Sequence, residues 1–196
     1  MRIVPLVSGG LDSTLMTILA VESGYDVSPL FVDYGQRSRN QELAACRRTF
    51  AENRLPAPKI ADLSGYGALI SSGLTDLRKD IFLDAFLPCR NLMFLLLGAA
   101  YAYQVQANAV AIGLLDEKSS LFPDQTKGFA RSAEDLLSKV LSKEILVLTP
   151  LMSMTKADVV RLAKKRGLTH TYSCHSGQAE PCGACVACRE YENLEV

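Results

Sequence analysis

Ser8-Gly9-Gly10-Leu11-Asp12-Ser13-Thr14 is the stretch of sequence that decides the fold. It follows the apolar run 2–7 and precedes a helical pattern over residues 11–23, which Gly24 ends. Glycines let a backbone approach a ligand closely, the first N–H groups of a helix lack intrahelical partners, and the helix dipole favours negative charge. The stretch therefore predicts an anion-binding loop between a buried strand and a helix.

The side chains of this loop narrow the interpretation. Ser8, Ser13 and Thr14 add hydroxyl donors, but no lysine follows the glycines, so the spacing differs from that of a Walker A loop. The pattern S-G-G-x-D-S resembles the pyrophosphate loop of the PP-loop ATPases, and this resemblance implies cleavage of ATP to AMP and pyrophosphate. A plain turn at a capped helix start is the alternative on this stretch alone.

The composition limits the class of protein. The 196 residues suit one domain with a small appended element, and 48% apolar with 21% charged residues is typical of globular proteins. Basic and acidic residues balance at 21 each, which argues against a large nucleic-acid partner. We expect a cytoplasmic protein without signal peptide or membrane span, because the longest apolar run, 92–105, is short and is interrupted by Tyr101 and Gln104.

Strand patterns alternate with helix patterns along the chain. Strands are expected at residues 2–7, 27–33, 59–62, 109–113 and 145–149, and helices at 11–23, 40–52, 91–106, 127–141 and from the cap Thr155 to Gly167. This alternation predicts an α/β fold, a parallel five-stranded sheet with helices on both faces. Ligands of such sheets bind at the carboxyl ends of the strands, where residues 8–14, 33–37 and 113–116 would meet.

Two segments have unusual compositions. Residues 64–87 are rich in glycine, serine and charge, so we expect a mobile flap rather than core. The helix at 91–106 is apolar on nearly all sides and is expected to be buried. Its Tyr101 and Tyr103 suit a homodimer contact as well as core packing.

Four of the six cysteines lie close together in the sequence, at Cys174, Cys182, Cys185 and Cys188. Two overlapping C-x-x-C steps and one earlier cysteine supply four thiolates, the closed ligand set of a structural Zn²⁺ site. An Fe–S cluster is the competing interpretation, and His175 competes with Cys174 as a ligand. We favour zinc bound by four cysteines, because the surrounding nucleotide-type sequence carries no redox motif.

Taken together, these motifs resemble those of the QueC, or 7-cyano-7-deazaguanine synthase, family of queuosine precursor biosynthesis. The resemblance covers nearly the whole chain in collinear order. Beyond the loop it is carried by F-V-D-Y-G-Q-R at 31–37, L-P-C-R-N at 87–91, A-Y-A-Y-Q-V at 100–105, P-D at 123–124, T-P-L-M at 149–152 with Lys156, and the cysteine cluster.

The resemblance implies an ATP-dependent carbon–nitrogen ligase. Such an enzyme converts 7-carboxy-7-deazaguanine to the nitrile (preQ0) with ammonia and two ATP, using ATP, Mg²⁺ and Zn²⁺ as cofactors. The resemblance divides the chain into a PP-loop domain at 1–168 and a zinc-binding element at 169–196. It assigns nucleotide binding to Val7, Ser8, Gly9, Gly10, Leu11, Asp12, Ser13, Thr14, Asp33, Tyr34, Gln36 and Arg37.

The catalytic assignments also follow from the resemblance. Asp12 would orient the loop or hold Mg²⁺, while Arg90 and Lys156 would meet phosphate charge. Arg37 is a candidate for the same role or for the substrate carboxylate. A solvated or salt-bridged surface group is the alternative for each basic residue.

The chain departs from the family pattern at three places. Cys89 stands where the family usually has glycine, and we expect it to pack as a small apolar residue. Residues 118–126 keep only Ser120, Pro123 and Asp124 of the usual pattern, and the segment 64–87 is shorter than expected. We therefore expect ATP activation to be retained, whereas the acyl substrate or the attacking nucleophile stays open.

Three further functions compete with nitrile synthesis. A divergent ligase would stop at the amide or transfer the activated 7-deazaguanine acyl group to another amine. A zinc-ribbon binding module would use the loop only for a structural anion. A tRNA-thiolating PP-loop enzyme is disfavoured by the neutral net charge. The expected partners are a small 7-deazaguanine derivative and ammonia.

Overall fold

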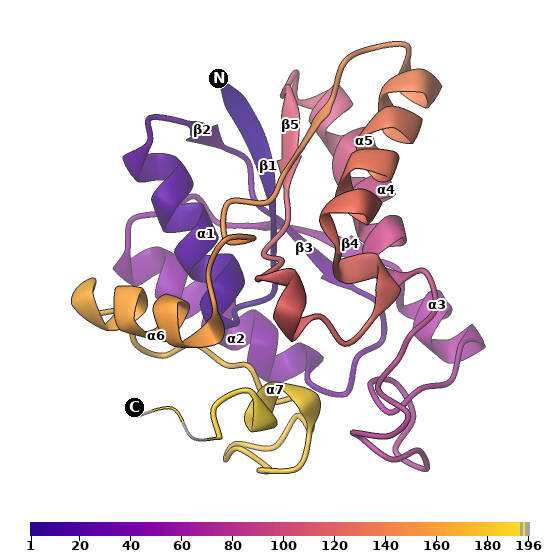
Figure 1. The fold of residues 1–196 in the computed structure, drawn as a ribbon, viewed down its shortest axis with the longest axis vertical. Helices are drawn as coiled ribbons and strands as arrows, with labels where there is room; N and C mark the ends of the chain where they lie inside the picture. The colour runs from indigo at the N-terminus through magenta and orange to yellow at the C-terminus, as the bar shows by residue number, and fades with distance from the viewer. Residues whose placement is uncertain (193, 195–196) are drawn as a thin grey trace.

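A parallel β-sheet with helices on both faces forms the centre of the structure, a computed structural model that describes residues 1–192 and 194 (Figure 1). The strands are β1 (Arg2–Val7), β2 (Asp26–Val27), β3 (Leu30–Asp33), β4 (Lys59–Asp62), β5 (Ala109–Ala111) and β6 (Leu146–Leu148). Their order is β4-β3-β1-β5-β6, with β2 paired beside β1, and every described pairing is parallel.

The helices occupy the connections between the strands. They are α1 (Leu11–Glu22), α2 (Arg39–Glu52), α3 (Ser64–Leu69), α4 (Arg90–Gln104), α5 (Lys127–Leu141), α6 (Lys156–Lys165) and α7 (Val186–Arg189), with the 3₁₀ turns η1 (Glu117–Ser119) and η2 (Pro123–Gln125). Within the described part of the chain, none of these helices combines the length and apolar character needed to span a bilayer.

Alternate side chains of β1 serve the two faces of the sheet. Val4 and Leu6 belong to a core cluster with residues of α4 and α5. Ile3 packs instead with α1 and α6, and Val7 packs with α2. Helices α1, α2 and α6 therefore cover one face and α4 and α5 the other (Figure 1).

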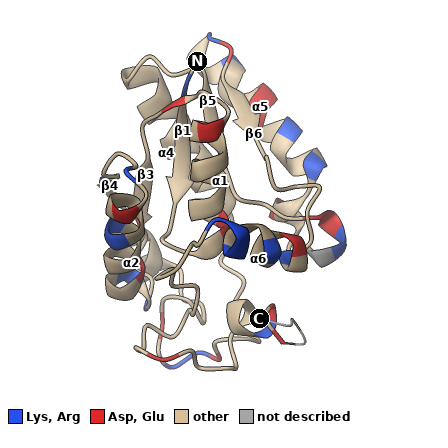
Figure 2. Ribbon diagram, turned by 90° about the vertical axis from the view of Figure 1, so that its left-hand side faces the viewer, with Lys and Arg blue, Asp and Glu red and all other residues tan. Residues whose placement is uncertain are grey.

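Charged residues lie on the outer helices. Figure 2 shows acidic and basic residues interspersed on α2, α5 and α6, and mostly uncharged residues in β1 and β5. The described structure thus agrees with the predicted α/β class of parallel sheet covered on both faces. The helix expected at 127–141 and the strand expected at 59–62 have the predicted bounds. Thr155 and Asp158 form the predicted capping box at the start of α6.

One expected strand is divided in two. The prediction of a continuous strand at 27–33 gives way to β2 and β3, both of which pair with β1. Pro29 lies in the gap, where it has no N–H group to donate to a ladder. The sheet consequently has six strands, five on its main path and β2 beside them.

Helix α4 is less buried than its composition indicates. Leu95 and Ala99 are fully enclosed in the core, but Leu96 is 49% exposed. The two tyrosines also differ, since Tyr101 packs against the core cluster whereas Tyr103 is 55% exposed. Helix α4 therefore has a buried inner face and a partly exposed apolar outer face. The homodimer contact stays a prediction.

Residues 64–87 are not the core-free flap that we expected. The segment begins with α3 and then buries Leu74 and Leu87 against Tyr34. Its outer surface remains apolar in part, because Leu69, Leu77 and Leu83 are 77–82% exposed. The expectation was wrong because the many turn-forming residues drew attention away from the apolar ones. These apolar residues are far apart in the sequence but form one small hydrophobic cluster.

The segment from residue 169 onward returns to the loop at the amino end of α1. The Tyr172 N–H donates to the Gly9 carbonyl at 2.9 Å, and Gly177 packs on the Arg37 carbonyl, so closely that a Cβ atom there would lie 2.3 Å away. The division at 168/169 stays a prediction, and residues 193, 195 and 196 of the predicted element lie outside the described residues.

Cys89 differs from its predicted packing role. Its side chain is exposed, and its backbone is in the left-handed region at φ 61° where α4 begins. Glycine adopts this conformation without steric cost, which gives a physical reason for glycine at the corresponding place of similar sequences. Cys46, by contrast, is buried in the core.

Candidate nucleotide-binding and metal-binding site

A cavity of about 260 Å³ opens at the carboxyl ends of β1, β3 and β5. Its apolar floor includes Leu6 and Val32, the next-to-last residues of β1 and β3, and Ile112, which follows β5. Nine of the predicted site residues line it: Val7, Ser8, Gly10, Asp12, Ser13, Tyr34, Gln36, Arg90 and Lys156. The predicted location at this edge of the sheet agrees with the described structure.

The loop Ser8–Thr14 has a backbone that only glycine fits at one point. Gly9 has φ +80°, and a Cβ atom there would lie 2.2 Å from the Glu42 carbonyl oxygen of α2. Gly10 then forms the amino-terminal cap of α1 without a side-chain capping bond. Because the first turn of a helix has unpaired N–H groups and a positive dipole end, this is a site suited to phosphate.

Hydrogen bonds between its own side chains hold the loop in shape. The Ser8 N–H donates to the Ser13 hydroxyl at 3.1 Å, and the two hydroxyls lie 3.2 Å apart. Thr14 is fully buried and donates to the Gly10 carbonyl at 2.9 Å. Gly9, Leu11 and Thr14 do not line the cavity, so a direct contact of their side chains with nucleotide stays a prediction.

Lys156 is the centre of an ion-pair network beside the loop. Its Nζ lies 2.9 Å from both carboxylate oxygens of Asp12 and 3.0 Å from Glu190, and it stands 4.8 Å from the centre of the Tyr191 ring. Burial alone would lower the pKa of Lys156, but the two carboxylates raise it above its usual value. The ammonium therefore stays protonated at neutral pH, as an anion-binding role requires.

A chain of buried polar groups lies behind the loop. The Glu42 carboxylate accepts hydrogen bonds from Ser38 at 2.7 Å and from the Gln36 amide at 3.0 Å. Gln36 in turn accepts from the Tyr34 N–H at 2.9 Å. Burial raises the pKa of Glu42, and burial also raises the pKa of Tyr34 to about 12 against an opposing effect of Arg90.

Asp33 and Arg37 do not line the cavity. Asp33 accepts a hydrogen bond from Arg39 at 2.7 Å and another from the Gly35 N–H at 3.1 Å, so it fixes the turn after β3. Arg37 donates to the Gly73 carbonyl at 3.0 Å, while its Nε is buried without a partner among the described residues. Their assignment to nucleotide or substrate stays a prediction, with a local structural role visible for each.

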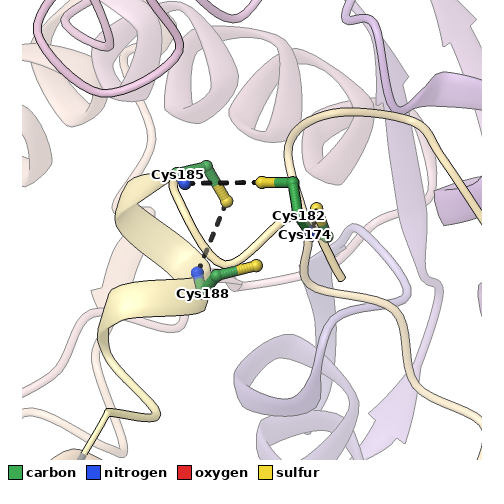
Figure 3. Close-up of side chains that lie close together, drawn as sticks. All are labelled: Cys174, Cys182, Cys185 and Cys188. Atoms are coloured by element: carbon green, nitrogen blue, oxygen red, sulfur yellow. Dashed lines mark hydrogen bonds between the residues drawn. The ribbon is translucent and has the colours of Figure 1, made fainter. Parts of the chain in front are cut away.

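The four predicted metal ligands come together. Sγ atoms of Cys174, Cys182, Cys185 and Cys188 all lie within 4.8 Å of one another (Figure 3). Figure 3 shows Cys185 and Cys188 at the short helix α7, with the Cys185 N–H donating to the Cys182 sulfur and the Cys188 N–H to the Cys185 sulfur, each at 3.4 Å. All four are free thiols.

This arrangement fits one tetrahedral ion. A Zn–S bond of about 2.3 Å places the sulfurs of a tetrahedral site about 3.8 Å apart, which agrees with the observed cluster. Burial raises the pKa of the Cys174 thiol, but hydrogen bonds from Ser176 and Cys182 outweigh it and lower that pKa to about 6, whereas burial raises the pKa of the Cys185 and Cys188 thiols. Thiolates are the form that binds metal. His175 is not a member of the cluster, so the alternative ligand set is not the one formed here.

Several residues that line the cavity were not assigned from the sequence. They are Glu42, Asn91, Tyr172, Ser173, His175 and Glu190. Four of these belong to the segment around the cysteines, which forms one wall of the cavity, and Ser173 accepts a hydrogen bond from the Leu11 N–H at 3.5 Å. The sequence indicated only that these four residues lie close to the predicted metal ligands. The cysteine spacing does not reveal which part of the molecule the residues between the ligands face.

A second cavity of about 210 Å³ adjoins the first and shares Asp12, Gly113 and Lys156 with it. Residues 113–116 line this cavity, as their place after β5 predicts. The altered segment 118–126 contributes Gln125 to both cavities, Phe122 to the first and Ser120 to the second. Within it, Asp124 accepts hydrogen bonds from Asn91 at the start of α4.

The fold and the site define an α/β protein of the PP-loop class, with a nucleotide-type loop at its sheet edge and a four-cysteine site beside it. Its fold is similar to that of the U34-tRNA thiolase NcsA from Methanococcus maripaludis, solved with its [4Fe-4S] cluster, at a TM-score of 0.62 and 18% identity, over 98% of this chain and 63% of that chain.

Sequence comparison gives the family. Residues 2–193 match the family model described as queuosine biosynthesis protein QueC, and the chain belongs to this family. It is 33% identical to the 7-cyano-7-deazaguanine synthase of Aliarcobacter butzleri, over 94% of this chain and 86% of that protein. It is also 33% identical to that of Acetivibrio thermocellus, over 95% and 89%.

Proposed function

We propose that this protein is an ATP-dependent ligase that converts 7-carboxy-7-deazaguanine to 7-cyano-7-deazaguanine with ammonia. The curated relatives named for that product support the reaction. The observation that carries the proposal within the chain is the loop Ser8–Ser13 beside the protonated Lys156, where two adjoining cavities meet.

The chemistry requires two activation steps. The substrate carboxylate attacks the α-phosphorus of ATP, pyrophosphate leaves, and an acyl adenylate forms. Ammonia displaces AMP and loses a proton to give the amide. A second ATP adenylates the amide oxygen with loss of pyrophosphate and of one N–H proton, and elimination of AMP with the second N–H proton then leaves the nitrile.

The residues lining the cavity suit these steps by charge. The N–H groups at the start of α1 and the hydroxyls of Ser8 and Ser13 would bind the departing pyrophosphate. Lys156 and Arg90 would stabilise the negative charge that develops on the phosphate oxygens. The apolar floor at Leu6, Val32 and Ile112 suits an adenine ring.

Two metal ions form part of the proposal. Asp12 lines both cavities and would hold Mg²⁺, which would neutralise phosphate charge. The four cysteines would hold Zn²⁺, because one ion matches the compact sulfur cluster, whereas an Fe–S cluster binds its thiolates through separate irons and holds them farther apart. Six free thiols suit a reducing compartment, and we place the protein in the cytoplasm.

A divergent ligase that makes the amide, or a conjugate with another amine, is the second candidate. The altered segment 118–126 favours it, because Phe122 and Gln125 of this segment line the cavity where the second substrate would bind. The activation step is the same in both candidates.

One assay separates the candidates. Protein, ATP, Mg²⁺, 7-carboxy-7-deazaguanine and ammonium are incubated, nucleotides are quantified, and the organic product is identified by mass spectrometry. We expect AMP and pyrophosphate rather than ADP, and the nitrile mass with two AMP per product. An amide as the end product would select the second candidate. AMP at the background level would reject both.

Metal analysis of the purified protein is the companion test. We expect about one zinc per chain and a colourless protein. Stoichiometric iron together with a visible absorption band would show that the four cysteines bind an Fe–S cluster, and the zinc part of the proposal would then be wrong.

A further inference from the structure

The ring of His175 lines the cavity, and its hydrogen-bonding capacity is unused. The Nδ1 atom is buried and has no partner, one of two such buried side-chain atoms within residues 1–192 and 194. A buried polar group without a partner costs free energy, and such groups in a cavity are commonly completed by a ligand.

The metal site does not account for this ring. The four sulfurs supply the four ligands that a structural zinc ion needs, and His175 is outside this set. What the metal site does account for is the position of the residue. His175 follows Cys174 directly, and its N–H donates to the Cys185 sulfur at 3.4 Å, so two cysteines of the cluster hold its backbone.

The nucleotide does not account for the ring either. Phosphate-binding groups come from the loop, from α1 and from Lys156, and the apolar floor for the base comes from the strand ends. His175 belongs to the wall formed by the cysteine segment, which also contributes Tyr172, Val186 and Ala187 to the lining. A carboxylic acid that attacks the α-phosphorus has to occupy the space between these two parts.

We propose that His175 contacts the heterocycle of the acid substrate and sets its position, an inference that rests on the proposed function. The substrate class is a planar bicyclic acid with ring N–H and carbonyl groups. An imidazole can donate to the carbonyl through one nitrogen and accept from a ring N–H through the other. The four-cysteine element is then part of the substrate site as well as a structural unit.

Binding without turnover is tested by NMR of the histidine rings. The chain has two histidines, and the other, His170, is an exposed residue held by Arg48 and Glu52. With the zinc-loaded protein, an α,β-methylene ATP analogue and 7-carboxy-7-deazaguanine, we expect the His175 ring signals to shift when the acid is added. Those of His170 should stay in place.

Variants test whether the contact matters for the reaction. His175→Ala should raise KM for the acid about tenfold, as expected for one hydrogen bond lost in a buried site, with KM for ATP changed less than twofold. His175→Asn or His175→Gln, which keeps an amide near one ring nitrogen, should restore part of the effect. His170→Ala is the matched control, and zinc content should stay at one per chain in all variants.

Each contrary result has a distinct meaning. Loss of zinc in His175→Ala would make the residue a metal ligand and overturn the inference. Equal rises in both KM values, or no rise for the acid, would also overturn it while leaving the proposed ligase intact. If the acid shifts signals elsewhere but not those of His175, the inference fails alone. If the acid shifts no signals at all, the proposed function fails with it.

Discussion

The two walls of the cavity are built by different physical means. The loop Ser8–Thr14 is held largely by its own hydrogen bonds, because Gly9 takes the tight turn and the hydroxyls of Ser13 and Thr14 bond to the backbone of the loop. The wall from Tyr172 to Glu190 contains only a short helix, and its buried side chains are mainly those of the cysteines. The loop wall is supported by the sheet and by α2. The wall of the cysteine segment is held together by four sulfur atoms, which we expect to share one metal ion.

This difference separates two sources of stability that meet in one site. Burial of apolar side chains stabilises the sheet and therefore the phosphate end of the cavity. Metal binding would stabilise the other end, with its free energy acting as local folding free energy. Nucleotide binding and acid binding should then respond differently to the same perturbation, and the four predictions below test this separation.

Removal of a metal ligand should have the largest effect. Cys185→Ala deletes the most buried sulfur of the cluster, so zinc should fall from about one per chain to none, and ligase activity should fall by more than about 100-fold. Far-UV circular dichroism should change little, because the sheet and its helices do not depend on the ion. Cys89→Ala, which removes an exposed thiol outside the cluster, is the control and should behave as wild type. Global unfolding of Cys185→Ala would contradict the separation of the two walls.

Lys156→Met should have the next largest effect, since it removes the ammonium that joins the two walls through Asp12 and Glu190. We expect kcat/KM to fall by about 100–1000-fold, the cost of losing one preorganised stabiliser of developing charge. Zinc content should be unchanged. Lys164→Met, an exposed residue of the same helix, serves as control. A loss of less than tenfold would place Lys156 outside the reaction.

Gly9→Ala tests the self-supporting wall by urea unfolding, with Gly24→Ala as its partner. Both glycines have φ near +80°, but a Cβ atom meets nothing within 4 Å at Gly24 and the Glu42 carbonyl at 2.2 Å at Gly9. Gly24→Ala should cost about 1–2 kcal/mol for the left-handed backbone. Gly9→Ala should cost about 1–3 kcal/mol more for overpacking. If both variants lost the same free energy of unfolding, the loop would have to shift away from the added Cβ atom at little cost, which would contradict the tight fit at Gly9.

The smallest effect should come from the carboxylate behind the loop. Burial raises the pKa of Glu42, so ionisation is less favourable in the folded protein. Its contribution to stability is greatest below the unfolded pKa of about 4.3 and is lost as the pH rises toward the folded pKa. Glu42→Gln should remove this decline from the pH profile of the free energy of unfolding. Glu52→Gln, at a carboxylate whose pKa is lowered by Arg48 and His170, should change the profile in the opposite direction. If both variants changed the pH profile of the free energy of unfolding in the same direction, the raised pKa of Glu42 would be contradicted.

The sequence was informative wherever a local pattern determines the structure. The capping box at Thr155, the loop at the end of β1 and the four-cysteine spacing are short-range patterns, and each was found where the pattern predicted it. A strand broken at Pro29 shows the limit of even this information, because the same apolar run was compatible with one strand or two.

The cavity lining depends on contacts between distant segments, which single positions do not reveal. Thr14 and Ser13 are neighbours of similar chemistry, and both hydroxyls bond to the Gly10 carbonyl, yet only Ser13 lines the cavity, while Thr14 is fully buried. Arg37 lies beside Gln36 but is held by the 72–74 turn. Glu190 and His175 gained their places through the folding of the cysteine segment onto the loop, which spacing alone does not describe.

The bonds between the Gly9 region and residues 172–173 have a consequence for synthesis. The Leu11 N–H and the Ser173 hydroxyl are partners across 162 positions, so the ribosome makes the phosphate loop many seconds before the wall that completes the cavity. A nascent chain can form β1 and α1 early and still lack an enclosed place for an acid next to ATP. Competence for adenylation should therefore appear late in translation, when the cysteines have emerged and met their metal.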